Sequence, residues 1–480
     1  MRAARLAVVL ALGAALQERL VAGLPLEFNP VTRGGDTLCL SRNHPAVGAE
    51  LEDTSAAEAE IRELPESIVL AIEVAAAGGA NASETSPRAT DVGTVETPGF
   101  EATEPRQSRR LEATNADLQR LEQHFGASMD RNIRTLPGQG SVEPTPWPSS
   151  YWPMFQDGIN FVWSNGEPSP SEKYAMAHGL DPKQFSDTVS RTTGIDSMGS
   201  RRSCQSDGDC SSLRDGSRCG RRAGASAGRC IPAWFGICHA WAPAAILEPE
   251  PRCPVTVNGV TFRAFDIKAL ITELYDGANL PTVFTGARFN GRDNEPNNRD
   301  QYGRFRDPTR RDIGPGFFHI AVANIMGHRQ QSFIVDVSAG AEVWNQPVKS
   351  YAVVESNKMT PREAAWRYYR TSSYPFNPSA RSLQFIKNRF TWVVESNEDG
   401  PLVTTGRAAQ SLRSEDYSYL LELDGDDNII GGEWVGSSHT SHPDFLWFPT
   451  TKPAATLVTS VGLSYQNVSN LLAQSLQAQC

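Results

Sequence analysis

Residues 234–248 read WFGICHAWAPAAILE, and this stretch decides how the fold is interpreted. From Cys238 to Leu247 the side chains are mostly apolar and small, and Pro249 follows shortly afterwards, which predicts a buried helix beginning at or just before the cysteine. A thiol at a helix N-terminus lies at the positive end of the helix dipole, which favours the nucleophilic thiolate. Pro243 suits such a helix only within the first turn. The stretch therefore predicts a reactive cysteine on a buried helix.

The N-terminal quarter of this 480-residue chain differs in composition from the rest. Two arginines precede an eleven-residue apolar run at 6–16, a pattern typical of a secretory signal peptide and too short to span a bilayer. Residues 50–104 hold thirteen acidic and two basic side chains, as disordered segments do. The sequence RQSRR at 106–110 predicts a processing site; the alternative is a solvated basic cluster in a linker. We expect three parts: a signal peptide at 1–23, an acidic and largely disordered propeptide at 24–110, and a catalytic domain at 111–480.

The charge distribution and the signal peptide limit the classes of partner. Residues 1–110 carry a net charge of −6, which leaves −4 of the total of −10 for the remainder. No basic stripe with interleaved aromatic residues indicates nucleic-acid binding. No later run of eighteen apolar residues predicts a membrane span, so we expect a secreted, extracellular or cell-wall protein. Asn81 and Asn467 begin candidate glycosylation sequons.

The eight cysteines suggest disulfides and one free thiol. Residues 204–230 are rich in Gly, Ser, Asp and Arg, cannot bury much apolar area, and need covalent staples. Gaps of five, eight and ten residues between its cysteines are too long to favour zinc. If Cys39 leaves with the propeptide, two bridges in this segment and one between Cys253 and Cys480 would leave Cys238 unpaired; alternatively, Cys39 stays and pairs. The disulfide candidates are Cys204, Cys210, Cys219, Cys230, Cys253 and Cys480.

The partners that a thiolate nucleophile needs are predicted in residues 316–340. The runs FFHIAVANIM and SFIVDV flank Gly327-His328 and predict a hairpin with a two-residue turn. That register would place His319 opposite Asp336, close enough for the carboxylate to orient the imidazole. The alternative is a buried structural histidine. The chain order Cys, His, Asp is that of papain-like enzymes, which predicts an α+β fold with the cysteine helix packed on an antiparallel sheet.

Three further polar groups are weighed against this site. His439, His442 and Asp444 could bind a metal ion or supply the catalytic histidine, although Pro443 favours a loop. The segment 424–428 suggests a calcium loop, but a polar turn between two strands suits it better, because Ile429 stands where an EF-hand needs glycine. Residues 287–307 predict a surface loop near the substrate cleft that could also hold calcium.

Residues 343–355, VWNQPVKSYAVVE, carry a resemblance to a known family. They resemble the surface peptide of the secreted oomycete (Phytophthora-type) transglutaminases that plants recognise as elicitors. The similarity continues through PWPSSYWP, SRCGRRAGASAGRCIPAWFGICHAWAPAAILE, TVFTGARFNG, FHIAVANIMG and GGEWV…HPDFLWFP, essentially from residue 112 to 450. Trp344 and Pro347 of the peptide are present. Residues 349–352 read Lys-Ser-Tyr-Ala where the family usually has Arg-Gly-Phe-Lys, which puts recognition by a plant receptor in doubt.

The resemblance implies a protein-glutamine γ-glutamyltransferase that joins Gln and Lys side chains of protein substrates, among them cell-wall proteins. It implies Cys238 as nucleophile and calcium stimulation, while the chemistry itself needs no cofactor; which residues would bind a metal is unknown. His319 would be the acid and base and Asp336 its orienting partner. The oxyanion would be stabilised by the Cys238 N–H and the Trp234 indole. Competing interpretations are a papain-like cysteine protease and a non-enzymatic elicitor protein. The residues expected to line an amine channel are Trp234, Trp241 and Trp344.

Overall fold

The computed structural model describes residues 38–42, 44–49, 116–289, 299–306, 310–311 and 313–480. The predicted signal peptide, Asn81, the basic site at 106–110 and most of the predicted propeptide lie outside these residues. Part of the propeptide region is described: residues 38–42 and 44–49 pack with the segment that starts at residue 116 as one compact unit. We call residues 38–42 and 44–49 the strap. The sequence analysis, which predicted a largely disordered propeptide, did not anticipate this packed stretch.

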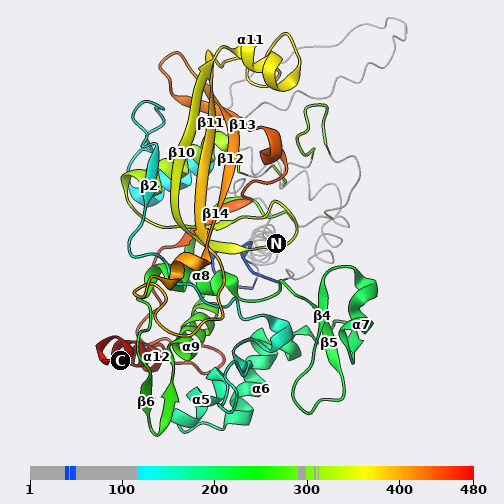
Figure 1. The fold of residues 1–480 in the computed structure, drawn as a ribbon, viewed down its shortest axis with the longest axis vertical. Helices are drawn as coiled ribbons and strands as arrows, with labels where there is room; N and C mark the ends of the chain where they lie inside the picture. The colour runs from blue at the N-terminus through cyan, green and yellow to red at the C-terminus, as the bar shows by residue number, and fades with distance from the viewer. Residues whose placement is uncertain (1–37, 43, 50–115, 290–298, 307–309, 312) are drawn as a thin grey trace, which may run out of the picture. The chain divides into compact units, whose positions relative to one another are not determined.

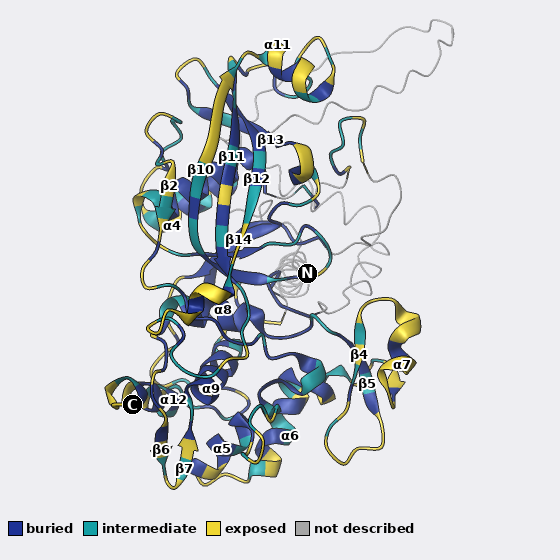
Figure 2. Cartoon of the chain, viewed as in Figure 1, coloured by how far each residue is buried: buried dark blue, intermediate teal, exposed yellow. Residues whose placement is uncertain are grey.

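A nine-stranded antiparallel sheet forms the frame of the molecule (Figure 1). Strand β2 pairs with β10 beside the main path. Its members, in spatial order, are β1 (Leu38–Cys39), β8 (Pro281–Gly286), β14 (Phe445–Pro449), β9 (Ile334–Asp336), β10 (Asn345–Met359), β11 (Ser382–Val393), β12 (Leu412–Leu423) and β13 (Ile429–Trp434), with β2 (Gln139–Ser141) off this path. Of the long strands, β11 alternates buried and more exposed positions along much of its length, as half-buried strands do, whereas β10 is buried at its start and exposed toward its end (Figure 2).

Helices and two small sheets complete the fold. Side-chain caps start several helices: Ser169, Asp181 and Ser464 each accept a backbone N–H three residues on. The helices are α4 (Ala116–Phe125), α5 (Pro170–Ala177), α6 (Pro182–Thr193), α7 (Asp207–Cys210), α8 (Cys238–Leu247), α9 (Ala264–Asp276), α10 (Pro315–Val322), α11 (Pro361–Ala364) and α12 (Tyr465–Gln477). The small sheets contain β3 (Ser203–Cys204), β5 (Gly228–Pro232) and β4 (Ser217–Gly220), and β6 (Val255–Val257) with β7 (Val260–Phe262). Short 3-10 and π turns are η3 (Met154–Gln156), η4 (Gly158–Asn160), η5 (Ile195–Met198), η6 (Ser211–Leu213), η8 (Ala323–His328), η9 (Ala365–Tyr369), η10 (Arg407–Ser411) and η11 (Gly436–His439).

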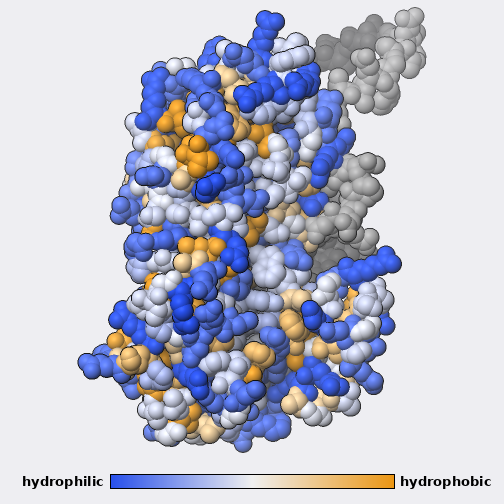
Figure 3. All heavy atoms as spheres, viewed as in Figure 1, coloured by the Kyte–Doolittle hydropathy of each residue, from blue (hydrophilic) through white to orange (hydrophobic). Residues whose placement is uncertain are grey.

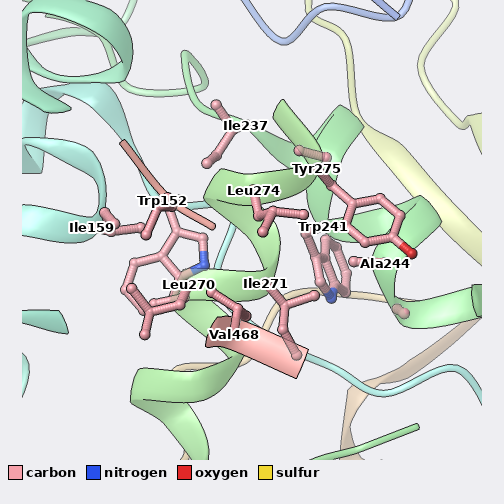
Figure 4. Packing of buried hydrophobic residues seen from close by; sticks show 14 of the residues in the cluster. Trp152, Ile159, Ile237, Trp241, Ala244, Leu270, Ile271, Leu274, Tyr275 and Val468 are labelled. Atoms are coloured by element: carbon pink, nitrogen blue, oxygen red, sulfur yellow. The ribbon is translucent and has the colours of Figure 1, made fainter. Parts of the chain in front are cut away.

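Two apolar clusters form most of the core. The first surrounds α8 and α9, where Trp241 of α8 lies among Ile271, Leu274 and Tyr275 of α9 (Figure 4). The second lies between α10 and the sheet strands β10 to β13. On the face drawn in Figure 3, hydrophobic residues occur instead in small groups among hydrophilic ones. The mixed α+β architecture predicted from the sequence is therefore confirmed, with the cysteine helix inside the first cluster.

The predicted hairpin at 317–337 is only half correct. Residues 315–322 form α10, and the helix continues as the π turn η8 through residue 328, so the first predicted strand is a buried helix. Pro315 occupies a first-turn position, where its missing N–H costs nothing. A continuous apolar run fits a buried strand and a buried helix equally well, and a run of ten residues, like this one, is longer than most strands and long enough for a helix. The second predicted strand is present as β9.

The disulfide predictions are confirmed for the described residues. Cys204 bonds to Cys219 and Cys210 to Cys230, which ties the β3–β5–β4 sheet to α7, and Cys253 bonds to the terminal Cys480. The free thiols are Cys39, which is exposed, and Cys238, which is buried. The alternative in which Cys39 pairs within the chain is therefore wrong. Within the described ranges, the structure has no helix long and apolar enough to cross a membrane.

Candidate functional site

Cys238 is the first residue of α8, as predicted, and its side chain is 1% exposed. Pro243 lies beyond the first turn, which differs from the prediction; because it has no N–H, it costs the helix one hydrogen bond without ending it. The thiol faces two groups of the segment that leads into β10. Its Sγ lies 3.7 Å from the Val343 carbonyl, and the Asn345 Nδ2–H donates to Sγ over 3.3 Å.

Asn345 is held from three sides. Its Nδ2 also donates to the Ala46 carbonyl of the strap at 2.7 Å, and its Oδ1 accepts the indole N–H of Trp447 at 2.8 Å. The Asn345 amide is therefore oriented with its nitrogen toward the thiol. The pKa of Cys238 is raised to about 12, mainly because the thiol is buried. The hydrogen bond from Asn345 lowers this pKa, and the negative charges of Glu395 and Asp336 raise it further. In this closed arrangement the thiol is neutral at physiological pH.

Asp336 lies in the site, but its partner across the sheet is Asn345 rather than His319. The pairing of β9 with β10 sets Asp336 opposite Asn345. Its Oδ1 accepts the backbone N–H groups of Trp344 at 2.9 Å and Ser338 at 3.1 Å. Burial, and then the negative charge of Asp444, raise the pKa of Asp336 well above its usual value. This carboxyl group therefore braces the backbone that carries the Val343 carbonyl and Asn345.

His319 lies on α10, in the second apolar cluster. Its Nδ1 lies 2.8 Å from the Tyr419 hydroxyl, and burial lowers its pKa to about 4. The described polar contacts of Cys238 and Asp336 do not include this imidazole. The predicted strand register, which placed His319 opposite Asp336, is wrong because residues 317–326 are helical.

A different histidine lies next to Cys238. His239 is 4% exposed, and its Nε2 lies 2.8 Å from Asp276 Oδ1 at the end of α9. Its Nδ1 accepts the Gly48 N–H at 3.1 Å, so the ring proton is on Nε2 and is donated to Asp276. The residue predicted from the sequence for the acid–base role was His319. No local pattern marks the pairing with Asp276, which is thirty-seven residues away.

The aromatic residues predicted near the site have separate positions. Trp344 is half-buried, with its indole N–H donated to Glu342 and its ring edge against Tyr151. Trp234 is also half-buried and packs on Phe235. Trp241 is fully buried and donates its indole N–H to the Trp147 carbonyl, so it is part of the core in this structure rather than of an open channel.

The stretch 343–355 is only partly a surface peptide. Val343, the segment 345–348 and Tyr351 are buried, whereas Val354 and Glu355 are exposed. Pro347 pairs with Ile334 of β9, inside the sheet. The first half of the stretch therefore forms a wall of the cysteine site, which the interpretation as a surface peptide did not foresee.

The candidate metal groups take part in other contacts within the described part of the chain. The only described cluster of three potential ligands is Cys204, Cys210 and Cys230, whose sulfurs are in disulfides. Asp424 caps the β12–β13 turn by accepting the N–H groups of Asp426 and Asn428, which confirms the polar turn. His442 is buried against Trp434, and its Nδ1 contacts the Ser438 carbonyl. The residues 290–298 of the predicted loop lie outside the described residues.

Asn467, the second candidate for glycosylation, lies in α12 and is half-buried. Its amide donates to the Tyr174 hydroxyl at 3.3 Å. A glycan on this nitrogen would require that contact to break.

Comparisons with known proteins agree with this architecture. The sequence model described as "Transglutaminase elicitor" matches residues 117–480. The chain is similar to a solved structure, the GP42 transglutaminase from Phytophthora sojae, with 49% sequence identity and a TM-score of 0.69 over 76% of this chain and 98% of that chain. No curated protein matches the chain. Since the family match covers α8, every strand of the large sheet except β1, and residues 343–355 together, the chain belongs to the transglutaminase elicitor family.

Proposed function

We propose that this chain is a secreted protein-glutamine γ-glutamyltransferase with Cys238 as its nucleophile and a papain-like arrangement of helix and sheet. One observation carries the proposal beyond the family match: Cys238 is the free thiol at the start of a buried helix, with the Asn345 amide directed at its sulfur. Residues 1–23 would be a signal peptide and residues 24–110 a propeptide. The substrates would be a glutamine donor protein and a lysine acceptor protein, with cell-wall proteins as candidates.

The chemistry proceeds through a thioester. The Cys238 thiolate attacks the carboxamide carbon of a substrate glutamine, the C–S bond forms, and the C–N bond breaks as the imidazolium gives its proton to departing ammonia. A lysine amine then attacks the thioester and loses a proton to the imidazole, so an isopeptide forms and the thiol is regenerated. Exclusion of water favours the amine over hydrolysis. No step requires a metal ion.

His239 is the imidazole that the geometry supports best. Its Nδ1 and the Cys238 sulfur both border Gly48, while Asp276 holds its Nε2–H. If Gly48 moved away, the unprotonated Nδ1 of His239 and the Cys238 thiol would both border the space that Gly48 had filled. The sequence analysis gave this role to His319, which in the structure is bonded to Tyr419. Asp336 would act by positioning Asn345.

The two histidines can be separated by matched variants. We expect His239→Gln to reduce amine incorporation by about a hundredfold or more, as loss of a general acid–base does, and His319→Gln to reduce it less than tenfold. A larger loss in His319→Gln than in His239→Gln would return the role to His319.

The activity itself is tested by incubating the chain, before and after cleavage at 106–110, with a glutamine-rich protein and a labelled primary amine. Incorporation of the amine supports transfer, and peptide fragments would instead indicate a cysteine protease. Cys238→Ala should abolish incorporation while the disulfides and the circular dichroism spectrum stay unchanged. Incorporation by Cys238→Ala would exclude this cysteine as the nucleophile. A non-enzymatic elicitor would give neither product but would still bind a plant receptor.

A further inference from the structure

The strap lies over the site, outside the residues that the family match covers. It begins as β1, which adds to the free edge of β8, and the Leu40 N–H donates to the Leu280 carbonyl at 2.7 Å. Its second part, residues 44–49, is buried throughout. His44 packs against Phe284 and Trp447 and bonds to the Thr282 hydroxyl. The strap is therefore packed into the catalytic domain at both of its parts.

Five consecutive carbonyl groups of the strap are each bound by the domain. Arg288, which is 1% exposed, donates to the carbonyls of residues 45, 47 and 49 at 3.3, 3.0 and 3.0 Å. Asn345 binds the carbonyl of residue 46, and the Gly236 N–H donates to that of residue 48 at 2.8 Å. These contacts bind the main chain of the strap through its carbonyls, in a segment that turns where the Val47 N–H donates to the His44 carbonyl at 2.9 Å, and the occupying side chains Ala46, Val47 and Ala49 are small.

Gly48 is the point at which the strap meets the reacting groups. A Cβ atom there would lie 3.1 Å from the Cys238 sulfur and 2.7 Å from the Gly236 carbonyl oxygen, closer than carbon atoms approach without a shift. Its N–H is donated to His239. Three groups of the site, Cys238, His239 and Asn345, are thus in contact with or bonded to the strap, and a glycine offers the thiol no carboxamide to attack.

We propose that the strap is an intramolecular inhibitor that fills the glutamine-donor groove, and that the donor is a polypeptide segment with small residues beside the reactive glutamine, bound through its main-chain carbonyls. The identity of the groove rests on the proposed transferase activity, whereas the blocking of Cys238 does not. Cleavage at 106–110 would leave the strap bound non-covalently, so activation requires its dissociation as well.

Substitution of Gly48 tests the blocking contact. In the full chain, Gly48→Val should overpack the contact with Gly236 and open the strap. We expect iodoacetamide to label Cys238, identified by peptide mass spectrometry, about tenfold faster or more than in the wild type. Gly48→Ala should give a smaller increase in the same direction. Ser41→Ala, an exposed strap position, is the control and should label at the wild-type rate. Equal labelling of Gly48→Val, Gly48→Ala and wild type would overturn the inhibitor proposal.

Added peptide provides a test that does not depend on the folding of a single variant. A synthetic peptide of residues 38–49 should slow the labelling of Cys238 in Gly48→Ala and in the chain cleaved at 106–110, whereas a scrambled peptide should not. Absence of any slowing would show that the strap does not bind as a separable inhibitor. Faster labelling without amine incorporation in the Gly48 variants would keep the blocking role and exclude the transferase.

Discussion

The two halves of residues 343–355 differ although they belong to one continuous stretch. The first half, residues 343–348, is buried apart from Trp344, and it supplies the Val343 carbonyl and the Asn345 amide to the thiol. The second half, residues 349–355, is half-buried apart from the buried Tyr351 and ends in exposed side chains. The differences from the family's usual peptide fall at 349–352, in the second half. The comparison shows that one strand can contact the cysteine site at one end and present exposed side chains at the other.

The largest expected effect is on the rate at which a reagent modifies the Cys238 thiol, and this rate tests whether the first half seals the site. If the first half and the strap seal Cys238, iodoacetamide at pH 8 should modify Cys238 about a thousandfold more slowly than the exposed Cys39, because only the thiolate reacts and the pKa of Cys238 is about 12. Peptide mapping after timed quenching measures both rates in one sample.

The contribution of the Cys238 thiol to the stability of the fold depends on pH in a definite direction. A raised pKa means that the fold favours the neutral thiol, so this contribution to stability is complete below the unfolded value near 8.5 and is lost as pH rises toward 12. Labelling of Cys238 should therefore quicken steadily above pH 8. Equal rates for the two cysteines at neutral pH would mean that the buried half does not seal the site.

A second test compares two asparagines of β10. We expect Asn345→Ala to lower the free energy of unfolding by about 2 kcal/mol, because it leaves the buried Trp447 N–H without its acceptor and removes the bond to Ala46. Asn357→Ala, at an exposed position of the same strand, should change it by no more than about 0.5 kcal/mol. Urea denaturation monitored by tryptophan fluorescence gives both values, and equal losses would contradict the division between the halves.

The smallest effect is expected at the start of the second half. Lys349 pairs with Glu143, whose side chain is 77% exposed, so Lys349→Ala should cost at most about 1 kcal/mol and should change amine incorporation less than twofold. Binding of a synthetic 343–355 peptide to plant membranes should respond to this position instead. A large loss of incorporation in Lys349→Ala would mean that the wall of the cysteine site also includes residues of the second half.

Local sequence predicted those parts that depend on neighbouring residues. The start of α8 at Cys238, the β12–β13 turn and strand β9 follow from helix, turn and strand patterns within a few residues. The disulfide-rich segment follows from its composition, and the three pairings were among those that cysteine parity allowed. The run at 317–326 was misassigned because an apolar segment buried on all sides has no periodicity that separates helix from strand.

By itself, the sequence determined that this protein has a helix beginning at Cys238, a stapled polar segment and an α+β core, because each of these depends on local patterns or composition, whereas counting cysteines left open whether Cys238 is free. Only the tertiary structure decided what faces the thiol: Asn345 rather than His319, a His239–Asp276 pair, and the carbonyl-bound strap. Those contacts join residues dozens to hundreds of positions apart. They are set by the packing of α8, α9 and the sheet, for which no local pattern carries the register.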